Sequence, residues 1–213
     1  MATVSSGMFF LLLTLAYRAG LTKELDHATF ALLGTIQNTT LDALGQADDE
    51  LARVIPTFAV AAVMAFVLAW KGRWRWIVPF FIGLTAAAEF FVKLGFGRGL
   101  HPGDLVAAAR ELIGFRYHTG ASFPSGHVAR SAFLAAVALR LVPPWVSVPL
   151  VAFAALTFLA RLYTEAHRLS DVVGGVALGV FAACAGDWLR AVLDARSSAR
   201  SRRRAQSGPE RAP

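Results

Sequence analysis

The chain has 213 residues, of which 56% are apolar and only 16% charged, and its mean hydropathy is +0.53. So little charge cannot cover the surface of a water-soluble domain, which excludes that class and indicates a membrane protein. The net charge of +7 would favour nucleic-acid binding in a soluble protein. Here the basic residues lie beside apolar runs, so we expect no nucleic-acid partner.

Apolar stretches recur at about the length that a spanning helix needs, about 17 to 25 residues. They predict an all-α integral membrane protein, a bundle of six helices. The predicted spans are about Val4–Tyr17, Val54–Trp70, Trp76–Phe91, Val128–Val142, Trp145–Ala160 and Val172–Leu189. The first run lacks a basic leader and a small-x-small cleavage site, so we expect a retained span and not a signal peptide.

Charge in the connecting segments predicts how the spans are oriented. The stretch Glu24–Glu50 is acidic, and we expect it to lie on the outer face as an amphipathic or loop structure. The link between the second and third spans has three bases and no acid: Lys71, Arg73 and Arg75. This link and the Arg-rich C-terminal tail should be cytoplasmic by the positive-inside rule. Six spans then put both termini in the cytoplasm and the connections after spans one, three and five outside.

The chain shows no internal repeat and no second domain. We expect a single transmembrane domain over residues 1–193 and a basic, disordered cytoplasmic tail over 194–213 that contacts anionic lipid headgroups. The single Cys184 excludes a disulfide framework and a cysteine zinc site. High alanine content and a short chain favour a bacterial inner membrane. The sequence does not indicate an oligomeric state.

Ionisable residues within or beside spans mark functional sites more often than they do in soluble proteins. In the stretch Glu89–Asp104, Glu89 and Lys93 are four residues apart, in the order that favours an ion pair on a helix. Arg98 and His101 follow among four glycines, which let the backbone approach a ligand closely. Taken alone, this pattern fits two alternatives equally well: an anion site and a cluster of side chains that snorkel to the membrane edge.

A second group begins at Pro124, which cannot extend a helix backwards and therefore marks a helix start. The free amides and positive dipole end of that helix form a phosphate site. Ser125 adds a hydroxyl, Gly126 leaves its amide uncovered, and His127 lies in the first turn. The alternative is an ordinary capped helix with a satisfied histidine. Arg130 lies one turn further on, and it either contacts a second phosphate or headgroup or snorkels to the interface.

A third group contains His167 and Asp171, which are four residues apart and would share a helix face. The carboxylate can then accept the ring Nδ1–H and leave Nε2 exposed as a nucleophile or base. Arg161 ends the preceding span, and a turn must bring it round to the same side. The alternative is a helix-capping Asp171 beside a surface histidine. All three groups fall at or near the predicted outward ends of the spans.

At these residues the sequence resembles the type 2 phosphatidic acid phosphatase superfamily, which includes membrane lipid phosphatases. The family pattern has three blocks: K-x6-R-P, P-S-G-H and S-R-x5-H-x3-D. The second block is complete at residues 124–127, and in the third only the leading serine is changed, to Ala160. The first block keeps Lys93, but Leu100 stands at its arginine position, and Arg98 is the nearest replacement. The resemblance covers about residues 50 to 190.

The resemblance implies a metal-independent phosphohydrolase without a cofactor, built on six spans. By position, His167 attacks phosphorus and forms a phosphohistidine, Asp171 holds its ring, and His127 protonates the leaving alkoxide and then activates water. The phosphate-binding positions are Lys93, Arg98, Ser125, Gly126 and Arg161, with His101 and Arg130 as further candidates.

A site at the outer membrane–water boundary favours an amphiphilic substrate that arrives sideways from the lipid. The resemblance implies a lipid phosphate or diphosphate: undecaprenyl diphosphate, phosphatidic acid or phosphatidylglycerol phosphate. Arg130 tips the expectation slightly towards the prenyl diphosphate. Two alternatives stay open. One is a metal-dependent membrane hydrolase with His127, His167 and Asp171 as ligands, and the other is a non-enzymatic lipid transporter or scramblase on the same bundle.

Overall fold

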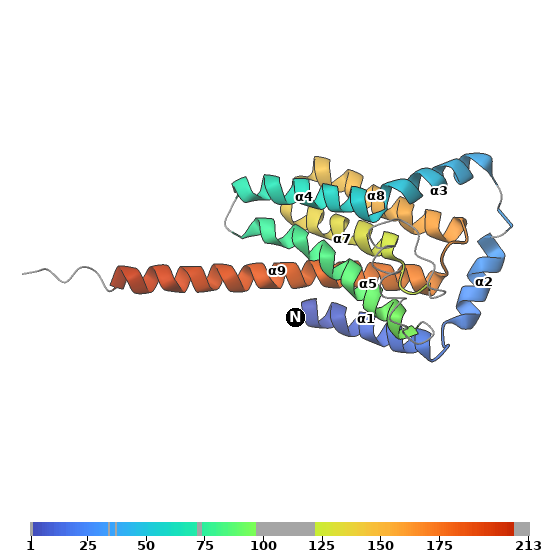
Figure 1. Cartoon of the computed structure of the whole chain (residues 1–213), viewed down its shortest axis with the longest axis horizontal. Helices are drawn as coiled ribbons and strands as arrows, with labels where there is room; N and C mark the ends of the chain where they lie inside the picture. The colour runs from blue at the N-terminus through green and yellow to red at the C-terminus, as the bar shows by residue number, and fades with distance from the viewer. Residues whose placement is uncertain (1, 34, 37, 72–73, 97–121, 207–213) are drawn as a thin grey trace, which may run out of the picture.

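The computed structural model describes residues 2–33, 35–36, 38–71, 74–96 and 122–206, and these residues form helices and no strand (Figure 1). The all-α prediction is therefore confirmed for this part of the chain. In chain order the elements are α1 (Ala2–Arg18), α2 (Lys23–Leu33), α3 (Thr39–Leu51), α4 (Val54–Lys71), the 3₁₀ helix η1 (Arg75–Phe81), α5 (Ile82–Phe96), α7 (Gly126–Leu141), α8 (Pro144–Tyr163) and α9 (Leu169–Gln206).

Several of these helices are long and apolar enough to cross a membrane. Within the described residues there are three: Arg75–Lys93, Pro144–Tyr163 and Leu169–Arg202. The number rises to five if each bent pair counts as one span, because α1 and α2 meet at 86° and α3 and α4 at 59°. The 16-residue α7 is shorter than the about 20 residues that cross a hydrocarbon core. The chain is a membrane protein, and the count of six spans stays a prediction.

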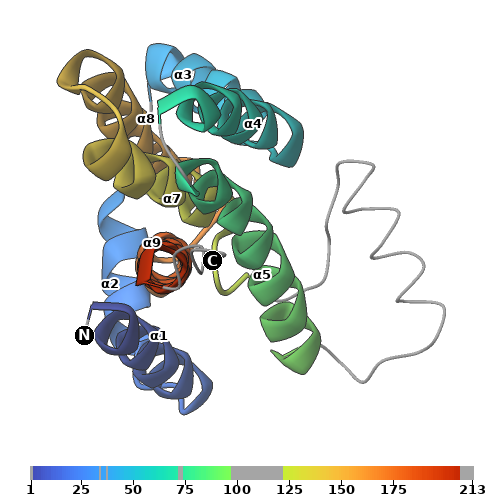
Figure 2. The same cartoon turned by 90° about the vertical axis from the view of Figure 1, so that its left-hand side faces the viewer.

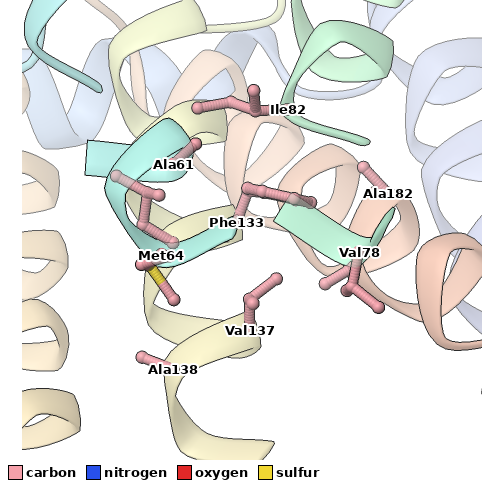
Figure 3. Close-up of a cluster of buried hydrophobic side chains, with 10 residues drawn as sticks. Ala61, Met64, Val78, Ile82, Phe133, Val137, Ala138 and Ala182 are labelled. Carbon is pink, nitrogen blue, oxygen red and sulfur yellow. The ribbon is translucent and has the colours of Figure 1, made fainter. Parts of the chain in front are cut away.

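The core of the bundle lies between α7 and α9. Figure 2 shows α9 end-on, with α1, α5 and α7 around it, and α7 also packs against α8 and α4. Figure 3 shows Phe133 and Val137 of α7 meeting Met64 of α4, Val78 of η1 and Ala182 of α9. All five side chains are buried. These contacts connect the helices that carry the ionisable residues into one body.

Two glycines let α9 lie directly against the backbone of α7. A Cβ atom added to Gly175 would lie 2.6 Å from the Ser125 carbonyl oxygen. One added to Gly179 would lie 2.8 Å from the Phe133 nitrogen and closer still to the Ala129 carbonyl oxygen. Small residues at a helix crossing allow this approach in membrane proteins. The crossing therefore holds the start of α7 against α9.

Gly179→Ala should destabilise the bundle, because the new methyl group would meet backbone atoms that cannot turn aside. Overpacking of this kind costs about 1–3 kcal/mol, so we expect a lower midpoint of thermal unfolding in detergent, measured by circular dichroism. Gly83→Ala in α5 is the matched control, because a Cβ at Gly83 meets nothing within 4 Å. Equal midpoints for the two variants would contradict the close-packed crossing.

The basic tail departs from its predicted disorder in the part that the structure describes. Helix α9 continues beyond Asp194 to Gln206. Arginine and alanine are good helix formers, and Arg190 forms an i,i+4 ion pair with Asp194 at 3.3 Å. The tail therefore extends an existing helix and does not have to nucleate a new one.

Candidate active site

The predicted site residues in the described part of the chain come together at one end of the bundle. The first residues of α7 and α9 and the last residues of α5 and α8 lie at this end (Figure 1). The first residue of α1 and the far end of α9 point the other way (Figure 1). The shared location is what the outward ends of alternating spans predict.

Helix α7 begins at Gly126, with Ser125 as its N-cap residue, as predicted. The Ser125 amide donates to the Asp171 carbonyl oxygen at 2.9 Å, which ties the start of α7 to the start of α9. The Ser125 side chain makes no capping hydrogen bond, and its buried hydroxyl oxygen has no partner among the described residues. The Ser125 side chain therefore does not cap α7. Its hydroxyl is available to a ligand.

A turn after α8 brings His167 back beside Arg161, as the spacing requires. The His167 amide donates to the Arg161 carbonyl oxygen at 3.2 Å. Glu165 has a left-handed φ of 55°, which reverses the chain. His167 thus precedes α9, which begins at Leu169. The prediction that His167 and Asp171 share a helix is therefore wrong. The two residues still meet because the turn folds back over the start of α9.

The Asp171 carboxylate both caps α9 and lies beside His167, so it combines the two roles considered for this motif. Its Oδ2 atom accepts the Arg168 amide at 2.9 Å and so caps α9. The same oxygen lies 3.6 Å from His167 Nδ1. That separation is longer than a hydrogen bond, and catalytic contacts are often long before substrate binds. The Asp171 side chain is fully buried, so its carboxylate faces the imidazole away from solvent.

Arg161 is buried and lies against two neighbouring aspartates of α3. Its Nη1 donates to Asp49 Oδ1 at 2.6 Å, and its Nη2 donates to Asp48 Oδ2 at 3.3 Å. The other Asp48 oxygen accepts the Thr157 hydroxyl at 2.6 Å. The sequence analysis did not predict the two aspartate partners of Arg161, since it interpreted the acids of this segment as a topology signal. The Asp48-Asp49 pair next to a span was the one available clue.

His127 faces the same aspartate as Arg161 does. Its Nε2 atom lies 3.6 Å from Asp49 Oδ1, has no hydrogen-bond partner in the described chain and is buried. His127 and Arg161 come from helices α7 and α8, and the carboxylate of Asp49 reaches both. An anionic oxygen therefore already lies between the predicted acid and the predicted phosphate-binding guanidinium.

A second carboxylate, Glu89, lies over the start of α7. It accepts from Lys93 at 2.7 Å, which confirms the predicted i,i+4 ion pair. Arg130 donates to its other oxygen at 3.0 Å and to the Ala52 carbonyl at 3.3 Å. A Cβ at Gly126 would overlap the Glu89 carboxylate. Because Arg130 is only 4% exposed, the snorkelling interpretation is wrong.

The segment between α1 and α4 packs onto this end of the bundle as two helices. Asp26 of α2 accepts both the amide and the hydroxyl of Ser170, each at 2.8 Å, at the start of α9. Tyr163, at the end of α8, donates to Asp42 of α3 at 2.8 Å. The segment expected to lie on the outer face therefore supplies side chains that anchor it to the site helices.

Two predicted residues, Arg98 and His101, lie outside the described residues. Within the described ranges, no group of three or more His, Cys, Asp or Glu side chains is arranged to hold a metal ion. His127, His167 and Asp171 therefore do not form such a group. The described site consists of two histidines, a buried aspartate and cations that carboxylates already neutralise.

Comparison with known proteins places the chain in a family context. The family model of the PAP2 superfamily matches residues 58–191. The fold is similar to that of a crystal structure described as the first transmembrane PAP2 type phosphatidylglycerolphosphate phosphatase from Bacillus subtilis, with a TM-score of 0.63. The two chains are 19% identical, and the match covers 92% of this chain and 96% of the other. No curated protein sequence matches significantly.

Proposed function

Because the chain belongs to the PAP2 superfamily, we propose that it is a membrane lipid phosphatase that works through a phosphohistidine intermediate. One observation carries the proposal: His167 lies against the buried Asp171 at the same end of the bundle as Arg161 and His127. Acyl- and phosphoryl-transfer sites use such an oriented imidazole as nucleophile or base.

In the first step, His167 Nε2 attacks phosphorus, an N–P bond forms, and the bond from phosphorus to the lipid oxygen breaks. Asp171 holds the ring through Nδ1 and stabilises the positive charge that the imidazole gains. His127 gives its proton to the departing lipid alkoxide. In the second step, His127 takes a proton from water, the water oxygen attacks phosphorus, and the N–P bond breaks. Inorganic phosphate leaves, and both histidines return to their starting states.

The remaining site residues bind the phosphate oxygens. Phosphoryl transfer depends on positioning and on neutralising oxygen charge, so buried cations suit it. Arg161 is the first of these, together with Lys93 and the amides and hydroxyl around Ser125 and Gly126. We keep Arg98 and His101, in the segment that follows α5, as proposed ligands. Metal independence and the absence of a cofactor are part of this proposal.

The substrate class is a lipid phosphate that reaches the site from the bilayer. Arg130 had favoured a diphosphate, but its guanidinium is buried against Glu89, so that argument loses its basis. Phosphatidic acid, phosphatidylglycerol phosphate and undecaprenyl diphosphate are therefore equal candidates. The phosphatase of similar fold is described as acting on the second of these.

We also propose that the site faces away from the cytoplasm in a bacterial inner membrane and that both termini are cytoplasmic. Arginines recur along the far end of α9, at the opposite end from the site (Figure 1). Positive charge concentrates on the cytoplasmic side of membrane proteins. The division into a domain at 1–193 and a tail at 194–213 belongs to the same proposal.

Purified protein in detergent should release phosphate from at least one lipid of this panel in the presence of EDTA, and vanadate should inhibit the release. The measurement is free phosphate against time for the three lipids. Activity that EDTA abolishes and vanadate leaves intact would indicate a metal-dependent hydrolase. Absence of release from every lipid would favour the transporter alternative.

A further inference from the structure

The two aspartates that contact Arg161 differ in how firmly they are held. The Asp48 side chain is fully buried, and its two oxygens accept from Arg161 and from the Thr157 hydroxyl. The Asp49 side chain is 38% exposed. The second oxygen of Asp49 accepts a hydrogen bond from Arg53 at 3.1 Å, and the Arg53 side chain is also partly exposed. Both Asp48 oxygens are therefore bonded inside the bundle, whereas the Asp49 carboxylate is partly exposed to water beside Arg53.

The position of the Asp49 carboxylate is one that a phosphate oxygen would take. Asp49 Oδ1 lies 2.6 Å from Arg161 Nη1 and 3.6 Å from His127 Nε2. In the proposed mechanism, these two groups contact the transferred phosphate and the leaving oxygen. A carboxylate and a phosphate both present anionic oxygens that pair well with a guanidinium. Both cannot occupy this point at once.

A ligand can reach this carboxylate from outside the bundle. A pocket of about 630 Å³ lies between α3 and the end of α8, and Asp49 and Arg161 both line it. Gln46, Thr164 and Ala166 form other parts of its wall. Asp49 and Arg161 thus meet at the wall of this pocket.

We propose that Asp48 is a positioning residue that holds Arg161 in place, and that Asp49 occupies the site of a substrate phosphate oxygen and is displaced when substrate binds. This inference rests on the proposed phosphatase function of the same site. Substrate binding then exchanges one Arg161 contact, the one to Asp49, and keeps the other. The displaced carboxylate retains Arg53 as its counter-ion.

The competing interpretation is that Asp49 orients His127, as Asp171 does for His167. The first interpretation is favoured because the short contact of Asp49, at 2.6 Å, is to Arg161. The 3.6 Å from Asp49 Oδ1 to His127 Nε2 equals the separation of Asp171 and His167, but the Asp49 side chain is partly exposed whereas that of Asp171 is fully buried. The two interpretations predict opposite results for the same isosteric substitution.

Asp49→Asn should tighten the binding of inorganic phosphate at least about fivefold, because a competing anion is lost and the binding-competent state becomes more populated. Asp48→Asn should weaken it at least about tenfold, because Arg161 loses its fixed partner. The measurement is isothermal titration of the full chain in detergent with sodium phosphate, and KM for the hydrolysed lipid should change in the same directions. Glu24→Gln, at an exposed position of α2, removes an equal charge from the same acidic segment and is the control.

Direct binding separates this inference from the proposed function. If no lipid is hydrolysed, the function fails, and the phosphate titrations still test the two aspartates. Unchanged or weaker phosphate binding by Asp49→Asn would overturn the inference, as would a fall in kcat with KM unchanged, which would mark Asp49 as the partner of His127. If Asp48→Asn does not fold, Thr157→Val removes the other contact of Asp48 and should also weaken phosphate binding. Wild-type affinity in Thr157→Val would contradict the positioning role.

Discussion

Replacing His167 with alanine should lower phosphate release from a lipid phosphate by at least about 10⁴-fold, because the variant lacks the proposed nucleophile. The side chain is 14% exposed, and its one ion-pair contact in the described chain is with Asp171, so the fold should survive. Release is measured with radiolabelled lipid in detergent micelles. The thermal unfolding midpoint shows whether the variant is folded.

Asp171→Asn is the matched test of the same dyad. Asparagine keeps an oxygen for the Arg168 amide, so the cap of α9 should remain, while the charge that orients the imidazole is lost. A change of this kind costs up to about 10⁴-fold in kcat when the carboxylate fixes a tautomer. Near-normal turnover in His167→Ala would show that the reaction does not use this histidine, and near-normal turnover in Asp171→Asn would show that the carboxylate charge does not orient it.

His127→Ala should lower turnover of a lipid phosphate by about 10²–10⁴-fold, the usual contribution of general acid–base catalysis. The loss should be smaller for an aryl phosphate whose phenol is a good leaving group, because that oxygen needs no proton to depart. Comparing the loss in kcat/KM for the two substrates isolates the acid step, because this ratio covers only the steps up to departure of the leaving group. Equal losses on both substrates would contradict the assignment of His127 as the acid.

The same variant should also slow the second step, because the proposed mechanism has His127 activate the water. With the aryl phosphate, the variant should therefore release a burst of phenol and then turn over slowly. The burst amplitude reports the fraction of enzyme in the covalent form. Asp171→Asn, which impairs the first step, should show no burst.

Local patterns predicted the parts of the site that lie close together in the chain. Pro124 marked the start of α7 correctly, and the Glu89–Lys93 spacing predicted a pair that the structure contains. The five residues between Arg161 and His167 required a turn, and the turn is present. These features depend on backbone geometry over a few residues, which spacing can express.

Contacts between distant segments were not predictable in this way. Arg161 meets Asp49 across 112 positions, and the Asp48-Asp49 pair beside a span does not indicate which distant residue its carboxylates contact. The distant partner of Arg130 was not predictable either. Its spacing from His127 suggested that Arg130 contacts a second phosphate or a headgroup. Its partner, Glu89, lies 41 positions earlier and neutralises it. Hydropathy likewise marked the apolar runs but not the 86° and 59° bends that complicate the number of spans.

The most direct test of the account is to trap the covalent intermediate. His127→Ala is mixed with a ³²P-labelled lipid or aryl phosphate, quenched in alkali within a turnover, and digested for mass spectrometry. The account predicts an acid-labile, alkali-stable phosphoryl group on His167 and no label when His167→Ala is added to the same variant. Label on another residue, or label that persists in the double variant, would contradict it.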